Sequence, residues 1–457
     1  MSELGSEQRP LQVAVIGSGP SGFYAAEALL KSDLSVKVNM LERLPVPYGL
    51  VRSGVAPDHP KLKQAIQVYA KIAESSDFNL LANVTVGETI SIAELREFHH
   101  VLILANGAET DRKLGVPGEG LTGSHTATEF VGWYNGHPDY RDRSFDLTSE
   151  RAVIIGQGNV AADVARILSK SVDELKNTDI AKHALDSLAK SKIREIHVVG
   201  RRGPAQVKFT PKELREFDNL EICKAIVDNE ELRLNQESET ELADKSNSSQ
   251  RKIYDQLSKL AALETDEKLR SCHFTFLKSP KELQGIDRLQ KVIFEQNRLS
   301  GEPLQQSARG TGETSEIETG ILFRSIGYRG VALAGLPFDQ QKGIIPNSLG
   351  RIEEDGRSIP GLYATGWIKR GPTGIIGTNR ADSVATVHSI LEDLQILDTG
   401  TEKSGADGLC NLLHSRNVRY VSYKDWKKID QSEIDRGKSK NKPREKYTYV
   451  SEMLDLL

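Results

Sequence analysis

Three glycines near the N-terminus have a spacing that suits phosphate binding. Gly17, Gly19 and Gly22 follow the apolar run 11–16 and precede residues 23–31, which have the composition of a helix. At such a junction of strand, turn and helix, the first glycine permits the sharp turn and the second lets the backbone approach a pyrophosphate. The third lets helix and strand pack closely. The positive end of the helix then holds the phosphates.

An acidic residue stands where such a unit contacts a ribose. A second apolar run, residues 36–41, ends at Glu42, 20 residues after Gly22. A carboxylate there can accept hydrogen bonds from ribose hydroxyls. Glycine-rich turns are common, so the turn alone is also compatible with a purely structural role. The strand, helix, second strand and acid in register predict an adenine-dinucleotide site.

A proline-rich loop, residues 44–60, follows the second strand, and its prolines exclude a helix interior. Loops at the carboxyl ends of parallel strands form the ligand crevice, so we expect this loop to wrap the cofactor. Its His59 is the one group there that can titrate near neutrality, and it serves either the cofactor or a hydrogen bond within the turn. After a helical stretch, residues 83–87 alternate as expected for a strand.

The same pattern occurs a second time. An apolar strand at 152–155 is followed by 156–161, with the spacing G-x-G-x-x-A, and by an amphipathic helix. The next strand, 195–200, ends in Arg201 and Arg202, where the first unit carries an acid. Two guanidiniums offer charge-assisted hydrogen bonds to a 2′-phosphate, whereas an acid selects a free 2′-hydroxyl. The second site is therefore predicted to bind NADP, with arginines of no binding role as the alternative.

Downstream, a short helix is predicted with Thr210 as its N-cap and Pro211 at its first position. Glu213 and Glu216 then share one face, and they either point into a nicotinamide cleft or solvate the helix start. Residues 228–270 are polar, and they predict one short amphipathic helix in what is otherwise a mobile excursion.

A late strand at 361–367 ends in small residues and leads to a glycine-rich helix start at 369–377. At the pyrimidine edge of an isoalloxazine, this positive helix end would stabilise the negative charge of a reduced flavin. A glycine-rich helix start without a ligand is the alternative. Because the second nucleotide unit lies between the first unit and this late segment, the sequence predicts an α/β fold with one domain inserted in another.

Composition excludes several classes of protein. The chain has 457 residues and a net charge of -4, so nothing global attracts nucleic acid or an anionic membrane, and no apolar run is long enough to span a bilayer. Cys223, Cys272 and Cys410 are widely spaced without a C-x-x-C motif. They indicate a reducing compartment and argue against a disulfide scaffold, a zinc site or a redox-active dithiol. Residues 1–10 resemble neither a signal peptide nor a transit peptide.

The motifs together resemble those of the adrenodoxin reductase family, the mitochondrial ferredoxin-NADP reductases. The resemblance covers nearly the whole chain and rests on residues 15–22, 49–52, 55–60, 156–161, 200–204 and 366–374. It implies two Rossmann-like dinucleotide-binding domains of the glutathione-reductase-like kind, with the NADP domain inserted in the FAD domain. The FAD-binding domain would comprise 1–107 and 330–457, including a C-terminal extension, and the NADP-binding domain 108–329.

The resemblance also implies which residues serve the cofactors. For FAD they are Gly17, Gly19, Pro20, Ser21, Gly22, Glu42, Leu50, Val86, Trp367, Gly374, Ile375 and Ile376. For NADP they are Gln157, Gly158, Asn159, Val160, Arg201, Arg202, Glu213 and Gly374. The family's cleft histidine and acids map to His59, Asp163 and Glu216, which we expect to be catalytic, and no metal site is expected.

The implied activity is hydride transfer from NADPH to FAD, then transfer of single electrons to an acidic, adrenodoxin-like [2Fe-2S] ferredoxin. That ferredoxin would supply pathways such as cytochrome P450 reactions or iron–sulfur and haem biosynthesis. The alternatives are a flavoprotein that passes electrons to another subunit or a quinone, and a non-catalytic dinucleotide sensor. Two basic segments, the pair Arg251 and Lys252 and the tail 436–446, are either docking surfaces or solvated charges.

We expect a monomer that binds no nucleic acid and has at most a peripheral association with membranes. The expected compartment is the mitochondrial matrix, for a mature form without its transit peptide, or the cytoplasm if the source is a bacterium.

Overall fold

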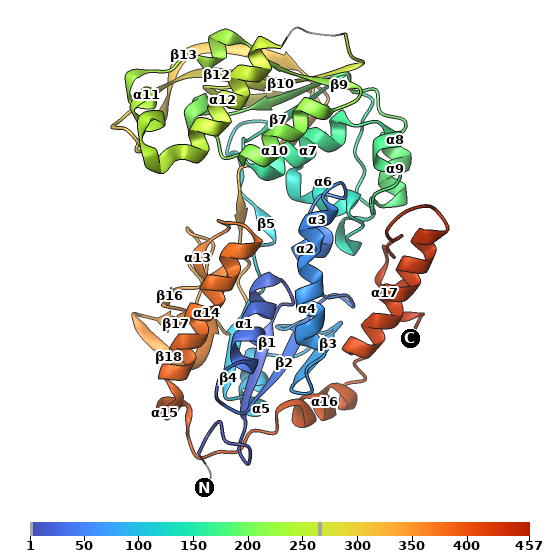
Figure 1. Cartoon of the computed structure of the whole chain (residues 1–457), viewed down its shortest axis with the longest axis vertical. Helices are drawn as coiled ribbons and strands as arrows, with labels where there is room; N and C mark the ends of the chain where they lie inside the picture. The colour runs from blue at the N-terminus through green and yellow to red at the C-terminus, as the bar shows by residue number, and fades with distance from the viewer. Residues whose placement is uncertain (1–2, 264–266) are drawn as a thin grey trace. The chain divides into compact units, whose positions relative to one another are not determined.

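The computed structural model describes residues 3–263 and 267–457 (Figure 1). Its internal contacts divide the chain into two units. The first consists of Met1–Val55, His59–Thr110 and Gly327–Leu457, and the second of Ala56–Asp58 and Asp111–Ile326. The short segment Ala56–Asp58 thus groups with the second unit, although the sequence analysis assigned it to the first domain.

A seven-stranded sheet forms the centre of the first unit. Its strands are β1 (Leu11–Ile16), β2 (Val36–Glu42), β3 (Phe78–Ala82), β4 (Val101–Leu104), β16 (Asn347–Ser348), β17 (Arg351–Glu354) and β18 (Arg357–Ala364). Parallel strands follow the order β18-β4-β1-β2-β3, and β17 and β16 extend the sheet antiparallel beyond β18. The carboxyl ends of β1, β2, β4 and β18 therefore meet at one edge, where ligands of such sheets bind.

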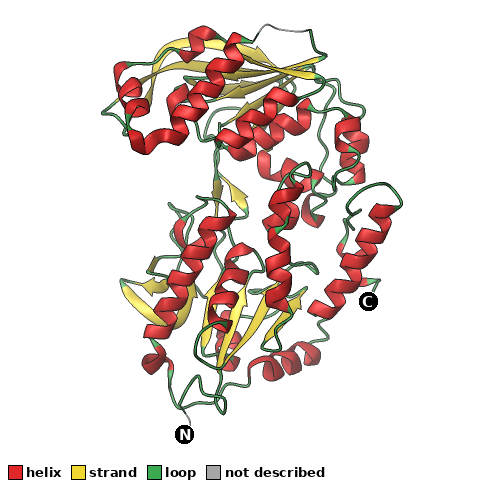
Figure 2. Ribbon diagram, in the orientation of Figure 1, coloured by secondary structure: helices red, strands yellow, loops and turns green. Residues whose placement is uncertain are grey.

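Helices cover both faces of this sheet (Figures 1 and 2). Successive residues of a strand point to opposite faces. Val13 and Val15 of β1 accordingly share an apolar cluster with α1 (Pro20–Leu30), α14 (Ile376–Glu392) and α17 (Tyr423–Lys438). Ala14 and Ile16 share another with α5 (Ile92–Phe98) and α16 (Gly405–Ser415). The remaining elements are α2 (Leu50–Ser53), α3 (Pro60–Lys63), α4 (Ala65–Ala73), α13 (Trp367–Arg370), α15 (Leu394–Leu397), α18 (Val450–Leu454), β5 (Thr110–Asp111) and β15 (Tyr328–Arg329).

The second unit has a six-stranded parallel sheet of its own. The strands are β6 (Ser124–Thr126), β7 (Arg151–Ile155), β8 (Glu195–Val199), β9 (Cys223–Val227), β10 (Arg270–Thr275) and β14 (Ile321–Arg324), in the order β6-β14-β7-β8-β10-β9. A separate antiparallel sheet consists of β11 (Lys278–Gln284), β12 (Lys291–Ser300) and β13 (Ser307–Glu318). The helices are α6 (Ala127–Tyr134), α7 (Asn159–Ser169), α8 (Val172–Leu175), α9 (Lys182–Leu188), α10 (Pro211–Arg215), α11 (Gln236–Ala243) and α12 (Ser248–Ala262).

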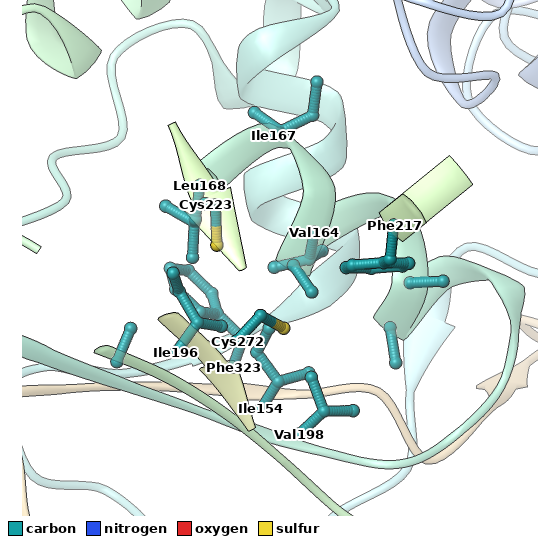
Figure 3. Close-up of a cluster of buried hydrophobic side chains, with 14 of the residues drawn as sticks. Ile154, Val164, Ile167, Leu168, Ile196, Val198, Phe217, Cys223, Cys272 and Phe323 are labelled. Carbon is teal, nitrogen blue, oxygen red and sulfur yellow. The ribbon is translucent and has the colours of Figure 1, made fainter. Parts of the chain in front are cut away.

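Two apolar clusters hold the layers of the second unit together. On one face of the parallel sheet, Ile154 and Val198 pack against Val164 of α7, as Figure 3 shows. On the other face, Val153 and Val199 pack in a cluster with residues of the antiparallel sheet. Each unit thus has a mainly parallel sheet covered on both faces, by helices in the first unit and by helices and a second sheet in the second unit. This architecture confirms the predicted α/β class.

The cysteines Cys223 and Cys272, on neighbouring strands β9 and β10, belong to the first of these clusters (Figure 3). Burial raises the pKa of both thiols. Because the thiolate is the reactive form, both are poor nucleophiles at neutral pH. Their place in the core explains their presence without a redox role.

Three expectations about secondary structure were wrong. Residues 83–87 are not a strand, because Asn83 has a left-handed φ of 61° that ends β3 at the residue before it. The loop 44–60 contains one helical turn, α2. The polar segment after Asp228 forms two helices, α11 and α12, instead of one. The residues whose spacing predicted the amphipathic helix are Ile253, Leu257, Leu260 and Leu263. The first three are buried in α12, whereas Leu263 is exposed.

The basic tail of the sequence packs against the first unit instead of forming a free surface. Lys442 and Lys446 are 8% and 4% exposed. Arg444 bonds to Asp430 and Glu433, and Glu433 also accepts two hydrogen bonds from Arg52, at 2.9 and 2.5 Å. The expectation of a docking surface over 436–446 is therefore wrong for these buried residues. No helix in the described part of the chain is long and apolar enough to cross a bilayer.

The buried group around Glu433 leads to a stability prediction. Glu433→Ala would leave the Arg52 guanidinium, which also lies 5.1 Å from the Trp426 ring centroid, without its carboxylate. Because a buried charge that loses its partner is costly, the free energy of unfolding should fall by about 3–5 kcal/mol in urea titrations. The control Asp435→Ala, which removes an exposed pair with Lys438 on the same helix, should have little effect. Equal effects of both variants would contradict the account.

Candidate nucleotide-binding sites

The turn between β1 and α1 is closed so tightly that two of its glycines cannot be replaced without movement of the backbone. Gly17 has a φ of 107°, and a Cβ there would lie 2.6 Å from the carbonyl oxygen of Ala105. A Cβ on Gly22 would lie 2.1 Å from the carbonyl oxygen of Gly17. These contacts allow only hydrogen at both positions, as the motif predicts.

The middle glycine of this turn faces open space. Nothing lies within 4 Å of a Cβ built on Gly19, which is the N-cap of α1. Gly19 has no side chain to cap the helix, and Pro20 at the first position has no N–H to satisfy. The amides of the first turn are therefore available to an anion, at the positive end of the helix.

Glu42 is fixed beside this turn at the end of β2. One of its oxygens, Oε2, accepts hydrogen bonds from the Ser18 amide at 3.2 Å and the Ser18 hydroxyl at 2.5 Å. The other, Oε1, accepts one from the Leu44 amide at 3.0 Å. A carboxylate oxygen can accept two bonds, so Oε1 retains capacity for a ribose hydroxyl.

The late segment meets α1 at this edge of the sheet, where α1 and α14 lie side by side in Figure 1. Gly366 has a φ of 74°, and a Cβ there would lie 2.1 Å from the Ser21 hydroxyl. That hydroxyl donates to Asn379 of α14 at 3.1 Å, and Ser383 donates to the Ser21 carbonyl at 2.9 Å. The structure thus brings the first and last parts of the predicted FAD site together.

Several predicted FAD contacts have surroundings that suit an aromatic ligand. Leu50 and Ile375, the N-cap of α14, are 42% and 64% exposed although both side chains are large and apolar. Trp367 stacks on Tyr328 with ring centroids 5.4 Å apart, and its buried Nε1 has no partner within the described residues. Gly374 adopts a φ of 86°, Ile376 begins α14, and Val86 is buried near the end of β3. These features fit an isoalloxazine.

The second unit repeats the turn between β7 and α7. Gly156 has a φ of 126°, and a Cβ there would lie 2.1 Å from the Ser325 carbonyl oxygen. Gly158, the N-cap of α7, has nothing within 4 Å. Asn159 Oδ1 accepts from the Thr210 amide at 2.8 Å, and Gln157 Nε2 donates to the Thr275 carbonyl at 2.9 Å. We call each glycine-rich turn with the start of its helix a cradle: residues 17–22 at α1 form the first, and residues 156–161 at α7, including Val160, form the second. The second cradle therefore also fits a pyrophosphate.

Arg201 and Arg202 follow β8, as the sequence predicts. Arg201 is exposed, and Arg202 Nη2 donates to the Gln206 carbonyl at 3.4 Å. Partial burial and the charge of Arg201 lower the pKa of Arg202. The positive charges of Arg201 and Arg202 repel one another, and an anion bound between them would offset that repulsion. A 2′-phosphate is such an anion.

A buried group of charges lies behind the second cradle. Arg166 of α7 is fully buried, and it bonds to Asp58 through Nε and Nη2 at 2.7 and 2.9 Å. It also contacts Asp163 at 2.7 Å and Glu213 at 3.3 Å, and Lys170 contacts Asp58 at 2.8 Å. Three carboxylates thus lie around two cations, and the charge of Glu216 also acts on Asp163 and Glu213.

The pKa values of the three acids reflect this arrangement. Burial opposes ionisation of Asp58, but its hydrogen bonds and charge pairing with Arg166 and Lys170 lower its pKa well below the usual range. Burial raises the pKa of Asp163 to about 6, despite Arg166. Burial and the charge of Asp163 raise the pKa of Glu213 to about 7. The group therefore holds a proton near neutral pH.

The predicted catalytic residues have different local settings. His59 belongs to the first unit, is 6% exposed and is the N-cap residue of α3. Asp163 lies in the buried charge group of the second unit. Thr210 caps α10 as predicted, and Glu213 of that helix is 6% exposed, so it does not solvate the helix start. Glu216, at the end of α10, is half-buried.

Comparisons with known proteins identify the family. The family model of the pyridine nucleotide-disulphide oxidoreductases matches residues 11–217. The chain is 43% identical to the mitochondrial NADPH:adrenodoxin oxidoreductase of Arabidopsis thaliana, with 98% of this chain and 96% of that one covered. It is 40% identical to the human protein of that name, with 99% and 93% covered. The chain belongs to the adrenodoxin reductase family.

A bacterial branch of the family is equally similar. The chain is 42% identical to the NADPH-ferredoxin reductase FprA of Mycobacterium tuberculosis. A solved structure of FprA in complex with NADPH matches this fold with a TM-score of 0.92, over 98% of this chain and 99% of that one. These comparisons confirm the resemblance and the fold inferred from the motifs, whereas the individual site residues stay predictions.

Sequence reasoning missed the residues that hold the predicted ones in place. Ser18, Asn379 and Asp382 brace Glu42, Ser21 and Gly366, and the Gly366 amide donates to Asp382 at 2.6 Å. Arg166 organises the buried acids. Ser18 lies within the first motif, but no local pattern marks the other three residues. Asn379 bonds to Ser21 and Arg166 to Asp58, which both lie far away in the chain.

The raised pKa of Glu213 leads to a prediction about pH. A carboxyl group whose pKa is higher in the folded state stabilises the fold at low pH, and this contribution is lost as the pH rises towards the folded value. Between about pH 5 and pH 8 the contribution of Glu213 to the free energy of unfolding should therefore fall, by on the order of 3 kcal/mol for a shift from 4.5 to about 7. In urea titrations across this range, the stability of the parent protein relative to Glu213→Gln should fall by that amount as the pH rises.

The matched control is Glu221→Gln, which changes an exposed acid of the same unit. This variant should keep the pH dependence of the parent protein. If Glu213→Gln also keeps it, the buried group does not hold a proton at neutral pH.

Proposed function

We propose that this protein is an FAD-dependent NADPH:ferredoxin oxidoreductase. The observation that carries the proposal is the difference between the two cradles. The first is followed by an acid, Glu42, and the second by two arginines, Arg201 and Arg202. One chain thus offers sites for a dinucleotide with a free ribose and for one with a 2′-phosphate. Relatives over nearly the whole chain carry names of NADPH-dependent adrenodoxin and ferredoxin reductases, which supports this assignment.

The first unit would bind and orient FAD. The open amides at the start of α1 hold its pyrophosphate, and Glu42 binds its ribose. The start of α14, at Gly374, Ile375 and Ile376, supplies a positive helix end for the ring. When bound, the flavin accepts two electrons as a hydride and passes them on singly. Trp367 and Leu50 would cover the ring and exclude water from it.

The second unit would bind NADPH. Gly158, Asn159 and Val160 receive the pyrophosphate at the start of α7, and Arg201 and Arg202 select the 2′-phosphate. We assign His59, Asp163 and Glu216 to orienting the nicotinamide and to moving protons. The raised pKa of Asp163 supports this role, because a group that titrates near neutral pH can both take and release a proton.

The proposed acceptor is an acidic [2Fe-2S] ferredoxin. A hydride donor and a one-electron acceptor need an intermediary such as the flavin, and the names of the relatives indicate a ferredoxin. The pair Arg251 and Lys252 on α12 offers a basic surface for it. Both residues are exposed, and Arg251 Nε and Nη2 are held by the Leu242 carbonyl at 2.8 and 2.5 Å. Surface charges of this kind speed docking at low salt.

We also propose that the enzyme acts as a monomer. Its compartment depends on the source of the chain. The plant and human relatives are named as mitochondrial, which favours the mitochondrial matrix for a eukaryotic source. For a bacterial source we propose the cytoplasm.

The nucleotide assignment is tested by Arg201→Ala/Arg202→Ala. Each charge-assisted hydrogen bond to the 2′-phosphate should contribute about 1.5–3 kcal/mol. The double variant should therefore reduce the ratio of kcat/KM for NADPH over NADH by about a hundredfold or more, with little change for NADH. Flavin reduction under anaerobic conditions measures both values.

A matched control is Arg194→Ala/Arg298→Ala, which removes two exposed arginines from the same unit. It should leave the NADPH to NADH ratio as in the parent protein. An unchanged ratio in Arg201→Ala/Arg202→Ala would contradict the assignment of the second cradle to NADP.

A further inference from the structure

A third cation lies near the arginine pair, six residues after Arg202, and the function described above does not use it. The amide of Lys208 donates to the Gln157 carbonyl at 2.8 Å, and Lys208 pairs with Gly158 in an isolated parallel bridge. The main chain at Lys208 is therefore fixed against the glycine-rich turn itself. Its side chain is exposed, so the ammonium group can reach a ligand of that turn.

The side chains of Lys208 and Arg202 line the same cavity, which has a volume of about 100 Å³. In the part of the chain that the structure describes, Lys208 Nζ has no ion pair or hydrogen bond, and Arg201 and Arg202 form no ion pair with a carboxylate. The segment 201–208 thus presents three positive charges, and the one carboxylate that acts on Arg202 through its charge is Glu241. Such a concentration suits an anion with more than one negative charge.

One carboxylate, Glu241, also lines this cavity, but its oxygens are already bonded. Oε2 accepts from Gln206 Nε2 at 2.8 Å, and Oε1 accepts from Gln306 Nε2 at 2.8 Å and from the Leu304 amide at 2.7 Å. Gln206 Nε2 also donates to Ser238 Oγ at 2.9 Å. These bonds fix the loop between Arg202 and Lys208 against α11, so the two cations keep their positions on the cavity.

We propose that Lys208 is a third determinant of NADPH specificity, whose ammonium group binds the 2′-phosphate together with Arg201 and Arg202. The proposal rests on the proposed function, because it assigns the 2′-phosphate of NADPH to this cavity. A phosphate monoester carries between one and two negative charges at neutral pH, so a third cation improves its charge balance. Its three oxygens can each accept a bond from a different donor.

The test compares two ligands that differ only in the 2′-phosphate. Binding of 2′-phospho-ADP-ribose and ADP-ribose to the FAD-loaded protein is measured by calorimetry, which needs no turnover. Lys208→Gln should weaken binding of 2′-phospho-ADP-ribose by about tenfold, the usual effect of one charge-assisted contact, and leave ADP-ribose unchanged. Lys208→Arg should retain most of the affinity, and the control Lys190→Gln, at an exposed lysine of the same unit, should change neither constant.

The remaining outcomes distinguish an error in the NADP assignment from an error in the role of Lys208. If the unmodified protein does not prefer the phosphorylated ligand, the NADP assignment itself is wrong. If it does prefer that ligand but Lys208→Gln binds it as tightly as before, only the role of Lys208 is refuted. An equal loss for both ligands would place Lys208 at the pyrophosphate and would also refute the proposal.

Discussion

Both nucleotide sites depend on the close approach of backbone to backbone at the turn between a strand and a helix. At Gly17, Gly22 and Gly156 a Cβ would lie between 2.1 and 2.6 Å from a carbonyl oxygen, so the turn closes only around hydrogen atoms. At Gly19 and Gly158 the space is open instead. The same short segment is therefore closed on its protein side and open on its ligand side. The helix behind it points its unsatisfied amides at that opening.

The residues beyond the turns give each cradle its selectivity through charge. Glu42 is held by three hydrogen bonds at the end of β2, which orient its carboxylate for ribose hydroxyls. Arg201 and Arg202 occupy the matching place after β8. Their positive charges repel one another, and a bound anion would offset this repulsion. Behind the second cradle, Arg166 fixes three acids in a buried group. Burial raises the pKa of Glu213 to about 7 and that of Asp163, which is assigned to catalysis, to about 6, so the group can hold a proton near neutral pH.

The sequence predicted those parts of the fold that short patterns determine. The strands and helices around both motifs form where expected, although α1 and α7 begin about one turn earlier, because the helix starts at the glycine cap. The strand expected at 83–87 does not form because β3 ends at Ala82, just before Asn83, whose left-handed backbone no hydrophobic pattern reveals. The segment after Asp228 was expected to hold one short amphipathic helix. Ile253, Leu257 and Leu260 do bury one face of α12, but the polar part before it forms a second helix, α11.

The site was predictable only in part, because some of its residues act through partners that lie far away in the sequence. Motif residues such as Gly17 and Arg201 can be identified locally, whereas Asn379 and Arg166 act through partners far away in the chain. In the tail, by contrast, residues were given a role that the structure does not support. Its row of lysines and arginines suggested a solvated or docking surface, but Glu433, Glu445 and Asp430 draw several of them into the first unit. Charge counts along a sequence do not show which charges are already paired.

The most direct test of the central claim is an anaerobic stopped-flow experiment with two successive mixings. The FAD-loaded protein is first mixed with NADPH and then with an oxidised [2Fe-2S] ferredoxin. The account predicts that the flavin absorbance bleaches rapidly with NADPH and much more slowly with NADH. The bleached flavin should then recover as two equivalents of ferredoxin become reduced. If the protein binds FAD and NADPH but the flavin absorbance does not bleach, the account is contradicted and a sensor is indicated. If the flavin bleaches but ferredoxin is not reduced, the electron acceptor is a different one.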